Sequence, residues 1–424
     1  MENNLDIEPY NKDYWYPDSH EFIRKAECSP EAYAFARSRV ATSSLANDVT
    51  TGKEWNKFKI IPDEYKTVEL TNGSLEYIDN DPEGKLNDAL PMVFIHGFLG
   101  HAFEFKPYLD YFADKVRCIS ISVLGLEKHF DKPKDLNDVS IKNYMDLIVE
   151  FVTEKLKFKR IVLVGHSFGG IFSNAFCYYK EELVAGVSFN AISNISSHLG
   201  FLAYTQSSYG IMYQMCDEDW KNLPDLNDRD FQKKYQEIAN KQVEDYYLDH
   251  QTSEDGKTTY FHYSIPEDPY ESIVSFCYTR TFLRASFGHY LPNLFKMFTW
   301  GEKDFVADTT RVYQSVYEYN KGTRQIKTNS QFLQPIKGVD YWSASKEVKT
   351  RLFGSEEVFE LKLKHIVEDN EYLHEAQIGH CHGFEDERHN VHTKRYKYLI
   401  PALEKYYLDV CLVEELKGKQ QAKI

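Results

Sequence analysis

The first regular pattern of apolar and polar residues is a two-residue alternation on both sides of a turn. Residues 65–70 and 74–78 alternate apolar and polar side chains, and the dipeptide Asn72-Gly73 lies between them. Asn-Gly between two alternating segments is typical of a tight hairpin turn, because both residues tolerate a positive φ. The pattern therefore predicts two antiparallel strands.

Beyond this hairpin, short apolar runs alternate with stretches of helical length. The apolar runs that predict strands are 91–95, 117–123, 161–164 and 183–189. Residues 105–114 have helical length, and residues 140–156 place their apolar side chains on one helical stripe. A hairpin followed by alternating strands and helices predicts an α/β fold, with a mostly parallel central sheet flanked by helices.

The run 161–164 leads directly into Gly165-His166-Ser167-Phe168-Gly169. This G-x-S-x-G spacing predicts a sharp turn from strand to helix that exposes the serine hydroxyl above the sheet. The two glycines are small residues at the points where the chain segments pass closely. The amide of Phe168 would lie at the start of the following helix, where it can donate to an oxyanion. The motif predicts serine-based acyl chemistry.

Four ordered motifs make the chain resemble the α/β-hydrolase family. They are Phe-Ile-His-Gly-Phe-Leu-Gly at 94–100, the serine turn, a segment at 292–304 that ends in Gly-Glu-Lys-Asp, and Gly-His-Cys-His-Gly-Phe-Glu at 379–385. In that family, the first motif supplies half of an oxyanion hole, the third supplies an acid and the fourth supplies a histidine base. The order Ser, Asp, His is the one that this fold requires. The resemblance implies an α/β-hydrolase fold.

The resemblance also implies a role for individual residues. Ser167 would be the nucleophile, Asp304 the acid and His380 the base, and the backbone amides of Phe98 and Phe168 would form the oxyanion hole. Serine is a weak nucleophile at neutral pH, so the histidine must accept its proton and the aspartate must orient the imidazole.

Alternatives remain for the acid and the base. Asp308 lies four residues after Asp304 and is the spare acid. His382 is the alternative to His380, which is favoured because it follows a glycine and is followed five residues later by Glu385.

Other histidines have less specific interpretations. The same region contains His374, His389 and His392, and a His-x-His pair can chelate zinc. No obvious set of Cys or Asp ligands surrounds them, so we expect no metal and no cofactor. We expect His96 and His166 to shape the pocket and to bond the backbone rather than to transfer protons.

Two departures from the family pattern affect the expected chemistry. The family includes epoxide hydrolases and haloalkane dehalogenases, which carry an aspartate at the turn, so Ser167 argues against both activities. Many members have Asp-x-x-Gly-x-Gly after the strand that ends near Val123, and this chain has Ser-Val-Leu-Gly-Leu-Glu at 122–127. We therefore expect the pocket to differ on that side.

The domain organisation follows from these motifs and the segments between them. The block between the strand at 183–189 and the acid motif lies where this family inserts a helical cap, and it is rich in Tyr, Phe and Met. The interval between Asp304 and His380 is longer than one helix and one strand need, which predicts a further insertion. The expected parts are an N-terminal extension at 1–60, a first core part at 61–190, a cap at 191–290, a core strand with the acid loop at 291–308, an insertion at 309–360, and the histidine loop with the C-terminal helix at 361–424.

Composition indicates which classes of partner and which cellular compartment to expect. The formal net charge of -15 disfavours nucleic acid and anionic membrane surfaces. The seven cysteines are scattered and odd in number, which favours a reducing compartment. The chain shows neither a signal-peptide pattern nor an apolar run of membrane-spanning length, so we expect a cytoplasmic or peroxisomal protein. Ala422-Lys423-Ile424 resembles a peroxisomal C-terminal signal, which would bind an import receptor.

These observations predict a serine hydrolase that cleaves a carboxylic ester with an apolar acyl group, a small molecule, through an acyl-enzyme. Three alternatives remain. An acyltransferase or an acyl-thioesterase would use the same residues, whereas a non-catalytic binding module would keep only the fold.

Overall fold

The computed structural model describes the central part of the fold and its C-terminal end. The described residues are 30–41, 64–97, 100–123, 139–192, 230, 233, 294–302, 304, 313, 316–317, 335–368, 380–385, 387 and 389–423.

Within these residues, nine strands form one sheet in the order β1-β9-β8-β7-β6-β4-β5-β3-β2. The strands are β1 (Val40–Ala41), β2 (Lys66–Leu70), β3 (Gly73–Asp79), β4 (Met92–Ile95), β5 (Cys118–Ile121), β6 (Ile161–His166), β7 (Val184–Asn190), β8 (Phe295–Gly301) and β9 (His380–Phe384). Strands β2 and β3 form the predicted antiparallel hairpin, β3 is also antiparallel to β5, and all other pairs are parallel. The predicted α/β class with a mostly parallel sheet is confirmed.

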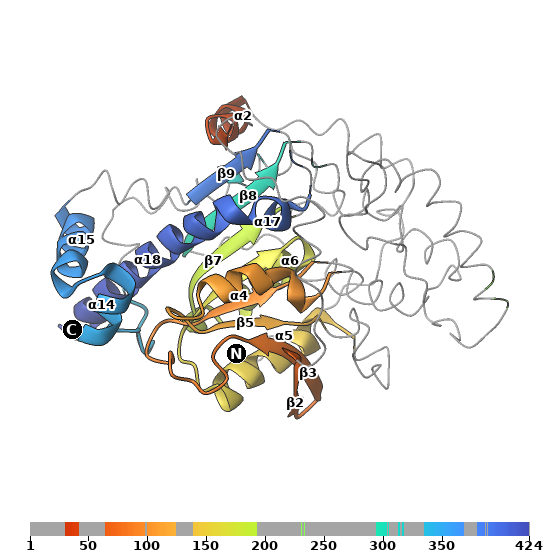
Figure 1. The fold of residues 1–424 in the computed structure, drawn as a ribbon, viewed down its shortest axis with the longest axis horizontal. Coiled ribbons are helices and arrows are strands. Elements are labelled where there is room, and N and C mark those ends of the chain that lie inside the picture. The colour runs from red at the N-terminus through yellow and green to blue at the C-terminus, as the bar shows by residue number, and fades with distance from the viewer. Residues whose placement is uncertain are drawn as a thin grey trace.

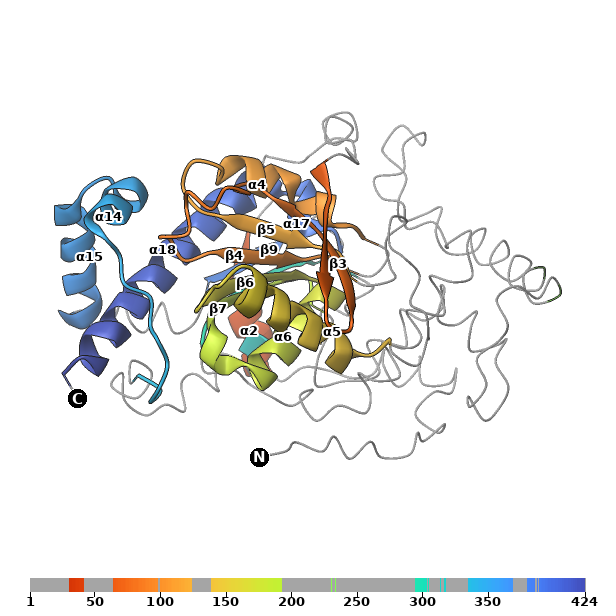
Figure 2. The same ribbon diagram turned by 90° about the horizontal axis from the view of Figure 1, so that it is seen from below.

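Helices cover both faces of this sheet (Figures 1 and 2). The helical elements are α2 (Pro30–Arg37), η3 (Ala102–Phe105), α4 (Lys106–Tyr111), α5 (Ile141–Glu150), the π-helical turn η5 (Phe151–Lys155), α6 (Phe168–Tyr179), η6 (Glu181–Leu183), α14 (Lys346–Phe353), α15 (Glu356–Glu368), α17 (Val391–Lys394) and α18 (Tyr396–Gln421). Helices α4 and α18 lie on one face, and α5 and α6 lie on the other. The parallel strands are therefore buried on both sides, which explains why β4, β6 and β7 are continuous apolar runs rather than alternating ones.

The predicted helix at 140–156 forms as α5 and η5. Its first turn is capped by Ser140, whose hydroxyl accepts a hydrogen bond from the amide of Asn143. Ile141, Tyr144 and Ile148 are buried on the predicted stripe. The helix therefore begins at a local capping signal and is held against the sheet by its apolar face.

The N-terminal extension contributes to the sheet. Its helix α2 begins at Pro30, in the position that proline favours, and β1 then pairs in parallel with β9 at the edge of the sheet. The two-residue strand β1 aligns Val40 with Gly383 and Ala41 with Phe384. A segment whose role is not legible from sequence thus pairs with the last strand.

The regions expected as a cap and an insertion are described only in part. Of the expected cap, only residues 191–192, 230 and 233 are described. The expected insertion at 309–360 ends inside α15, and Phe353, Phe359 and Leu363 belong to the same buried apolar cluster as residues of α18. This part of the chain therefore packs on the C-terminal helix.

At the C-terminus, the expected C-terminal helix forms as α18 and continues to Gln421. Ala422 and Lys423 follow it as exposed residues, and Ile424 lies outside the described residues. In the described part of the chain, none of the helices has the length and hydropathy needed to cross a bilayer.

A buried ion pair fixes α18 to the middle of the sheet. Arg160, at the start of β6, donates through Nη2 to Glu414 Oε1 at 2.6 Å and through Nε to Glu414 Oε2 at 2.9 Å. The two side chains are 2% and 0% exposed. Because this pair is desolvated and bidentate, removing one partner leaves an uncompensated buried charge.

Arg160→Met should therefore destabilise the folded chain by about 3–5 kcal/mol, measured by urea unfolding at pH 7. The matched control is Lys159→Met, because Lys159 pairs with Asp340 through side chains that are 73% and 66% exposed. This control should change the free energy of unfolding by less than about 1 kcal/mol. Equal losses in the two variants would contradict the role given to the buried pair.

Candidate active site

Ser167 occupies a strained turn between β6 and α6. Its backbone has φ 51° and ψ -113°, outside the regions that residues with a side chain ordinarily adopt. A Cβ atom on Gly165 would lie 2.4 Å from the carbonyl oxygen of Gly169, and one on Gly169 would lie 2.1 Å from that of Ile95. Both glycines of the motif are thus required by close backbone approach, as the sequence predicts.

A histidine links this serine to the predicted acid. The Ser167 hydroxyl lies 2.8 Å from Nε2 of His389, and Nδ1 of His389 lies 2.8 Å from Oδ2 of Asp304. The arrangement fits a neutral imidazole that donates from Nδ1 to the carboxylate and accepts the serine proton at Nε2. All three residues are 4% exposed. Such a chain of hydrogen bonds can activate the serine hydroxyl.

The three residues meet because they follow the carboxyl ends of parallel strands. Ser167 directly follows β6, Asp304 comes three residues after the end of β8, and His389 comes five residues after the end of β9. Parallel strands end at the same edge of a sheet, and ligands of open α/β sheets bind at that edge. Asp304 is fixed there by its amide, which donates to the carbonyl of Gly301 at 3.1 Å.

The structure does not bring His380 to the serine, so this sequence expectation is corrected. His380 is the first residue of β9 and is paired in register with Met297, whereas the carboxyl end of β9 is Phe384, opposite Gly301. Four residues of strand separate His380 from that edge, which is about 13 Å at ~3.3 Å per residue. Its Nε2 lies 3.0 Å from Oδ2 of Asp409 on α18 instead.

His382 is not near Ser167 either, because it lies inside β9, opposite Thr299. The segment expected to be a loop is a strand, and the loop that carries the histidine comes after it. The topology of the sheet is the feature that could have identified the histidine from the sequence. A base that meets Ser167 and Asp304 must follow the carboxyl end of its strand. His389 was considered at the sequence level only as a metal ligand, and the spare acid Asp308 and His374 lie outside the described residues.

Of the two expected oxyanion donors, Phe168 and Phe98, only Phe168 lies within the described residues. Phe168 is the first residue of α6, and the start of a helix favours negative charge. Phe98 lies outside the described residues. Its neighbour Gly97 is close to the serine, since a Cβ atom on Gly97 would lie 3.1 Å from the Ser167 Cβ. The described segment that ends at Gly97 therefore lies next to Ser167.

His96 fixes this segment through the backbone, as the sequence predicts. Its Nδ1 lies 2.7 Å from the carbonyl oxygen of Gly97, and the amide of Val123 donates to its Nε2 at 2.8 Å. The ring is therefore neutral, with the proton on Nδ1. Complete burial lowers the pKa of His96 from 6.5 to about 4, because desolvation penalises the imidazolium.

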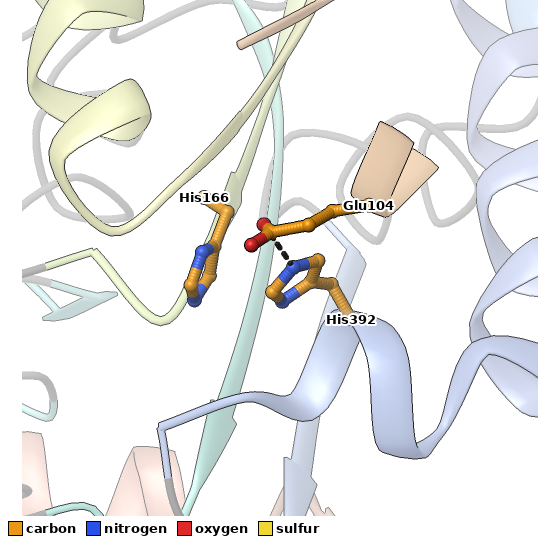
Figure 3. A group of neighbouring side chains, drawn as sticks. All are labelled: Glu104, His166 and His392. Atoms are coloured by element: carbon orange, nitrogen blue, oxygen red, sulfur yellow. Dashed lines mark hydrogen bonds and ion pairs between the residues drawn. The ribbon is translucent and has the colours of Figure 1, made fainter. Parts of the chain in front are cut away.

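A second buried group lies beside the serine and is formed by Glu104, His166 and His392 (Figure 3). Oε2 of Glu104 lies 3.1 Å from Nε2 of His392. The His166 and His392 rings stack with centroids 3.7 Å apart and planes 29° apart. The structure thus places the motif residue His166 between the pair and Ser167.

Glu104, His166 and His392 are residue types that can bind a metal ion, and they lie close together. One ligand atom from each residue lies within 4.8 Å of the others, and among the described residues this is the one group with such spacing. The lone pairs of stacked imidazoles lie in the ring planes, so they run side by side instead of converging on one point. The direct Glu104–His392 hydrogen bond also gives each of these two side chains one polar partner without an ion.

Burial determines the charges of this group. It lowers the pKa of His166 well below 6.5 and that of His392 below 6.5, although Glu104 acts in the opposite direction on His392. The pKa of Glu104 is also lowered: burial acts to raise it, and the hydrogen bond from His392 together with the surrounding histidines outweighs that effect. We therefore describe the group as a carboxylate that accepts a hydrogen bond from a neutral imidazole.

The comparisons with known proteins agree with this fold. A family model described as "alpha/beta hydrolase fold" matches residues 91–308, just over half of the chain. The chain therefore belongs to the α/β-hydrolase fold family, as the resemblance predicts.

Individual relatives are more distant. The chain is 28% identical over 119 residues to "Epoxide hydrolase 2" of Caenorhabditis elegans, which covers 28% of this chain and 30% of the relative. It is 30% identical over 117 residues to "Epoxide hydrolase 1" of the same organism, covering 28% of each chain. The match thus spans less than a third of the length of these curated relatives.

The solved structures that match this chain have low sequence identity to it. The N-acyl homoserine lactonase AidH is 13% identical with a TM-score of 0.47, covering 82% of this chain and 96% of its own. An epoxide hydrolase of Bacillus megaterium is 13% identical with a TM-score of 0.44, covering 81% of this chain and all of its own.

His96 should make the folded chain sensitive to acid. Between pH 6.5 and about 4 the unfolded chain protonates this imidazole and the folded chain does not, so stability is highest above pH 6.5 and falls as the pH decreases. Between pH 7 and pH 5, His96 should account for a loss of about 2 kcal/mol.

The measurement is urea unfolding of the wild type and His96→Gln at both pH values, and the variant should lose less stability between them. His365→Gln, at an exposed position of α15, is the control and should behave as the wild type. If His96→Gln kept the full pH dependence, the proposed origin of the acid sensitivity would be wrong.

Proposed function

We propose that this chain is a serine hydrolase that cleaves a carboxylic ester through an acyl-enzyme. The observation that supports this function best is the hydrogen bonding of His389, whose two ring nitrogens engage the Ser167 hydroxyl and the Asp304 carboxylate. Ser167 is then the nucleophile, His389 the general base and Asp304 the group that orients the base. The amides of Phe168 and Phe98 are the proposed oxyanion donors.

In the acylation step, Ser167 Oγ bonds to the ester carbonyl carbon and its proton moves to Nε2 of His389. The carbonyl oxygen becomes an oxyanion, and the positive end of α6 favours that charge. When this intermediate collapses, the ester C–O bond breaks and His389 donates its proton to the leaving alcohol. Asp304 stabilises the imidazolium while it exists.

In the deacylation step, water replaces the alcohol. His389 accepts a proton from the water as its oxygen attacks the acyl carbonyl. The bond to Ser167 then breaks, the serine recovers its proton and the carboxylic acid leaves. The chemistry therefore needs no cofactor.

Serine at the turn favours this activity over epoxide opening, although the two curated relatives are named epoxide hydrolases. A carboxylate that opens an epoxide forms an ester, which water can hydrolyse at its carbonyl. A serine oxygen that opened an epoxide would form an alkyl ether, which has no carbonyl for water to attack. Ser167 would therefore be consumed after one event, whereas an acyl group on Ser167 can turn over.

The acyl group is proposed to be apolar, because the segment expected to cover the site, 191–290, is rich in aromatic residues and methionine. The same acyl-enzyme would form from a thioester, and an alcohol could replace water as the acceptor. These two activities are distinguished by the products formed from a panel of esters and thioesters with and without an added alcohol.

A fluorophosphonate probe should label the wild-type chain and should not label Ser167→Ala, because the probe phosphonylates an activated serine. The readout is the mass of the intact protein, with heat-denatured wild type as the control for non-specific labelling. No labelling of folded wild type would favour the binding-module alternative.

His389→Ala should lower kcat for an ester substrate by on the order of 10⁴-fold or more, because the serine loses its base. His380→Ala is the matched control and should keep the wild-type kcat, since His380 pairs with Asp409 at the other end of β9. If His380→Ala were the inactive variant, the assignment of the base to His389 would be wrong.

A further inference from the structure

The segment that carries His389 is held by contacts other than those of the histidine ring. The carbonyl oxygen of His389 lies 3.3 Å from Nε2 of His166, and the hydroxyl of Tyr108 donates to the carbonyl of His392 at 2.6 Å. Arg395 and Glu387, on either side of the segment, form a buried ion pair at 2.7 Å. The position of the base is thus set by the surrounding structure.

The Glu104–His392 hydrogen bond occupies a central place among these contacts. Glu104 lies in η3, on the segment that begins at His96 and Gly97 beside the serine. His392 lies in α17, three residues after His389. The hydrogen bond therefore connects the segment that begins at His96 to the segment that carries His389.

The stacked ring of His166 connects the same pair to the nucleophile. His166 directly precedes Ser167, stacks on His392 and contacts the backbone of His389. Its ring centroid is also 5.0 Å from that of His389. All of these side chains are at most 4% exposed, so water does not compete for the contacts.

We propose that the Glu104–His392 pair is a positioning device for the catalytic base, holding His389 at hydrogen-bond distance from Ser167 through His166 and the α17 backbone. This role rests on the proposed function, because it assigns a purpose to the placement of His389 as a base. Neither side chain is a catalytic residue, since each acts through His389.

The test compares two substitutions of Glu104 with a control pair of the same chemistry. Glu104→Ala removes the acceptor, whereas Glu104→Gln keeps an oxygen that can accept from His392. The control is Asp409→Ala. The Asp409 carboxylate lies 3.0 Å from the His380 imidazole, which is a similar contact, and this pair is not next to Ser167.

Glu104→Ala should lower kcat for an ester by about 10- to 100-fold with little change in KM, because a small displacement of a catalytic group is costly. Glu104→Gln should recover most of the wild-type kcat. Asp409→Ala should keep the wild-type kcat and KM.

A second readout does not require activity. In chain labelled with ¹⁵N-histidine, the ring N–H resonance that disappears in His389→Ala reports the hydrogen bond to Asp304. This resonance should shift or broaden in Glu104→Ala and should be unchanged in Asp409→Ala. If the wild type were inactive but the resonance still changed in Glu104→Ala and not in Asp409→Ala, the result would contradict the proposed function alone.

Three results would overturn the positioning role. The first is an unchanged His389 resonance in Glu104→Ala, whether or not the chain is active. The second is an equal loss of kcat in Glu104→Ala and Asp409→Ala, which would indicate a general structural effect. The third is an activity that a chelator removes and added zinc restores, which would make Glu104, His166 and His392 a metal site.

Discussion

The left-handed turn at Ser167 is the constraint on which the candidate site depends. A backbone φ of 51° is unfavourable in free energy for a residue that has a side chain. Such a conformation persists only where several contacts with the surrounding structure hold it. Here the restraints are the close backbone approach at Gly165 and Gly169 and the bond from the Ser167 amide to the carbonyl of Asn190 at 2.8 Å. The turn directs the hydroxyl away from the core of the sheet and toward the histidine.

The sheet then determines which other residues can reach this hydroxyl. Strands β6, β8 and β9 are parallel, so the residues that follow them share one edge. The C-terminal helix α18 holds these strands in place through Arg160 and Glu414 and through Tyr406, whose hydroxyl donates to the carbonyl of Phe295 at 2.9 Å. Buried polar contacts thus fix the framework, and loops present the chemistry.

Much of this arrangement was predictable because it depends on local signals. The hairpin at Asn72-Gly73, the capped helix that begins at Ile141 and the turn at Ser167 each need only a few neighbouring residues to be recognised. Asp304 was also identified, because the segment at 292–304 resembles the acid motif of the family. His389 was not, because the strand before it, His380–Phe384, lacks a pattern that separates it from a glycine-containing loop.

By itself, the sequence determined the fold family and the turn that carries Ser167, because strand periodicity and G-x-S-x-G spacing are properties of contiguous residues. It indicated Asp304 through the resemblance of residues 292–304 to the acid motif of the family. Only the tertiary structure decided which histidine meets the serine. That choice depends on the register of β9 against β8, which places His380 at the far end of the strand and His389 at the shared edge. The pairing of Glu104 with His392 has the same origin, since those residues meet only after the sheet has brought distant segments together.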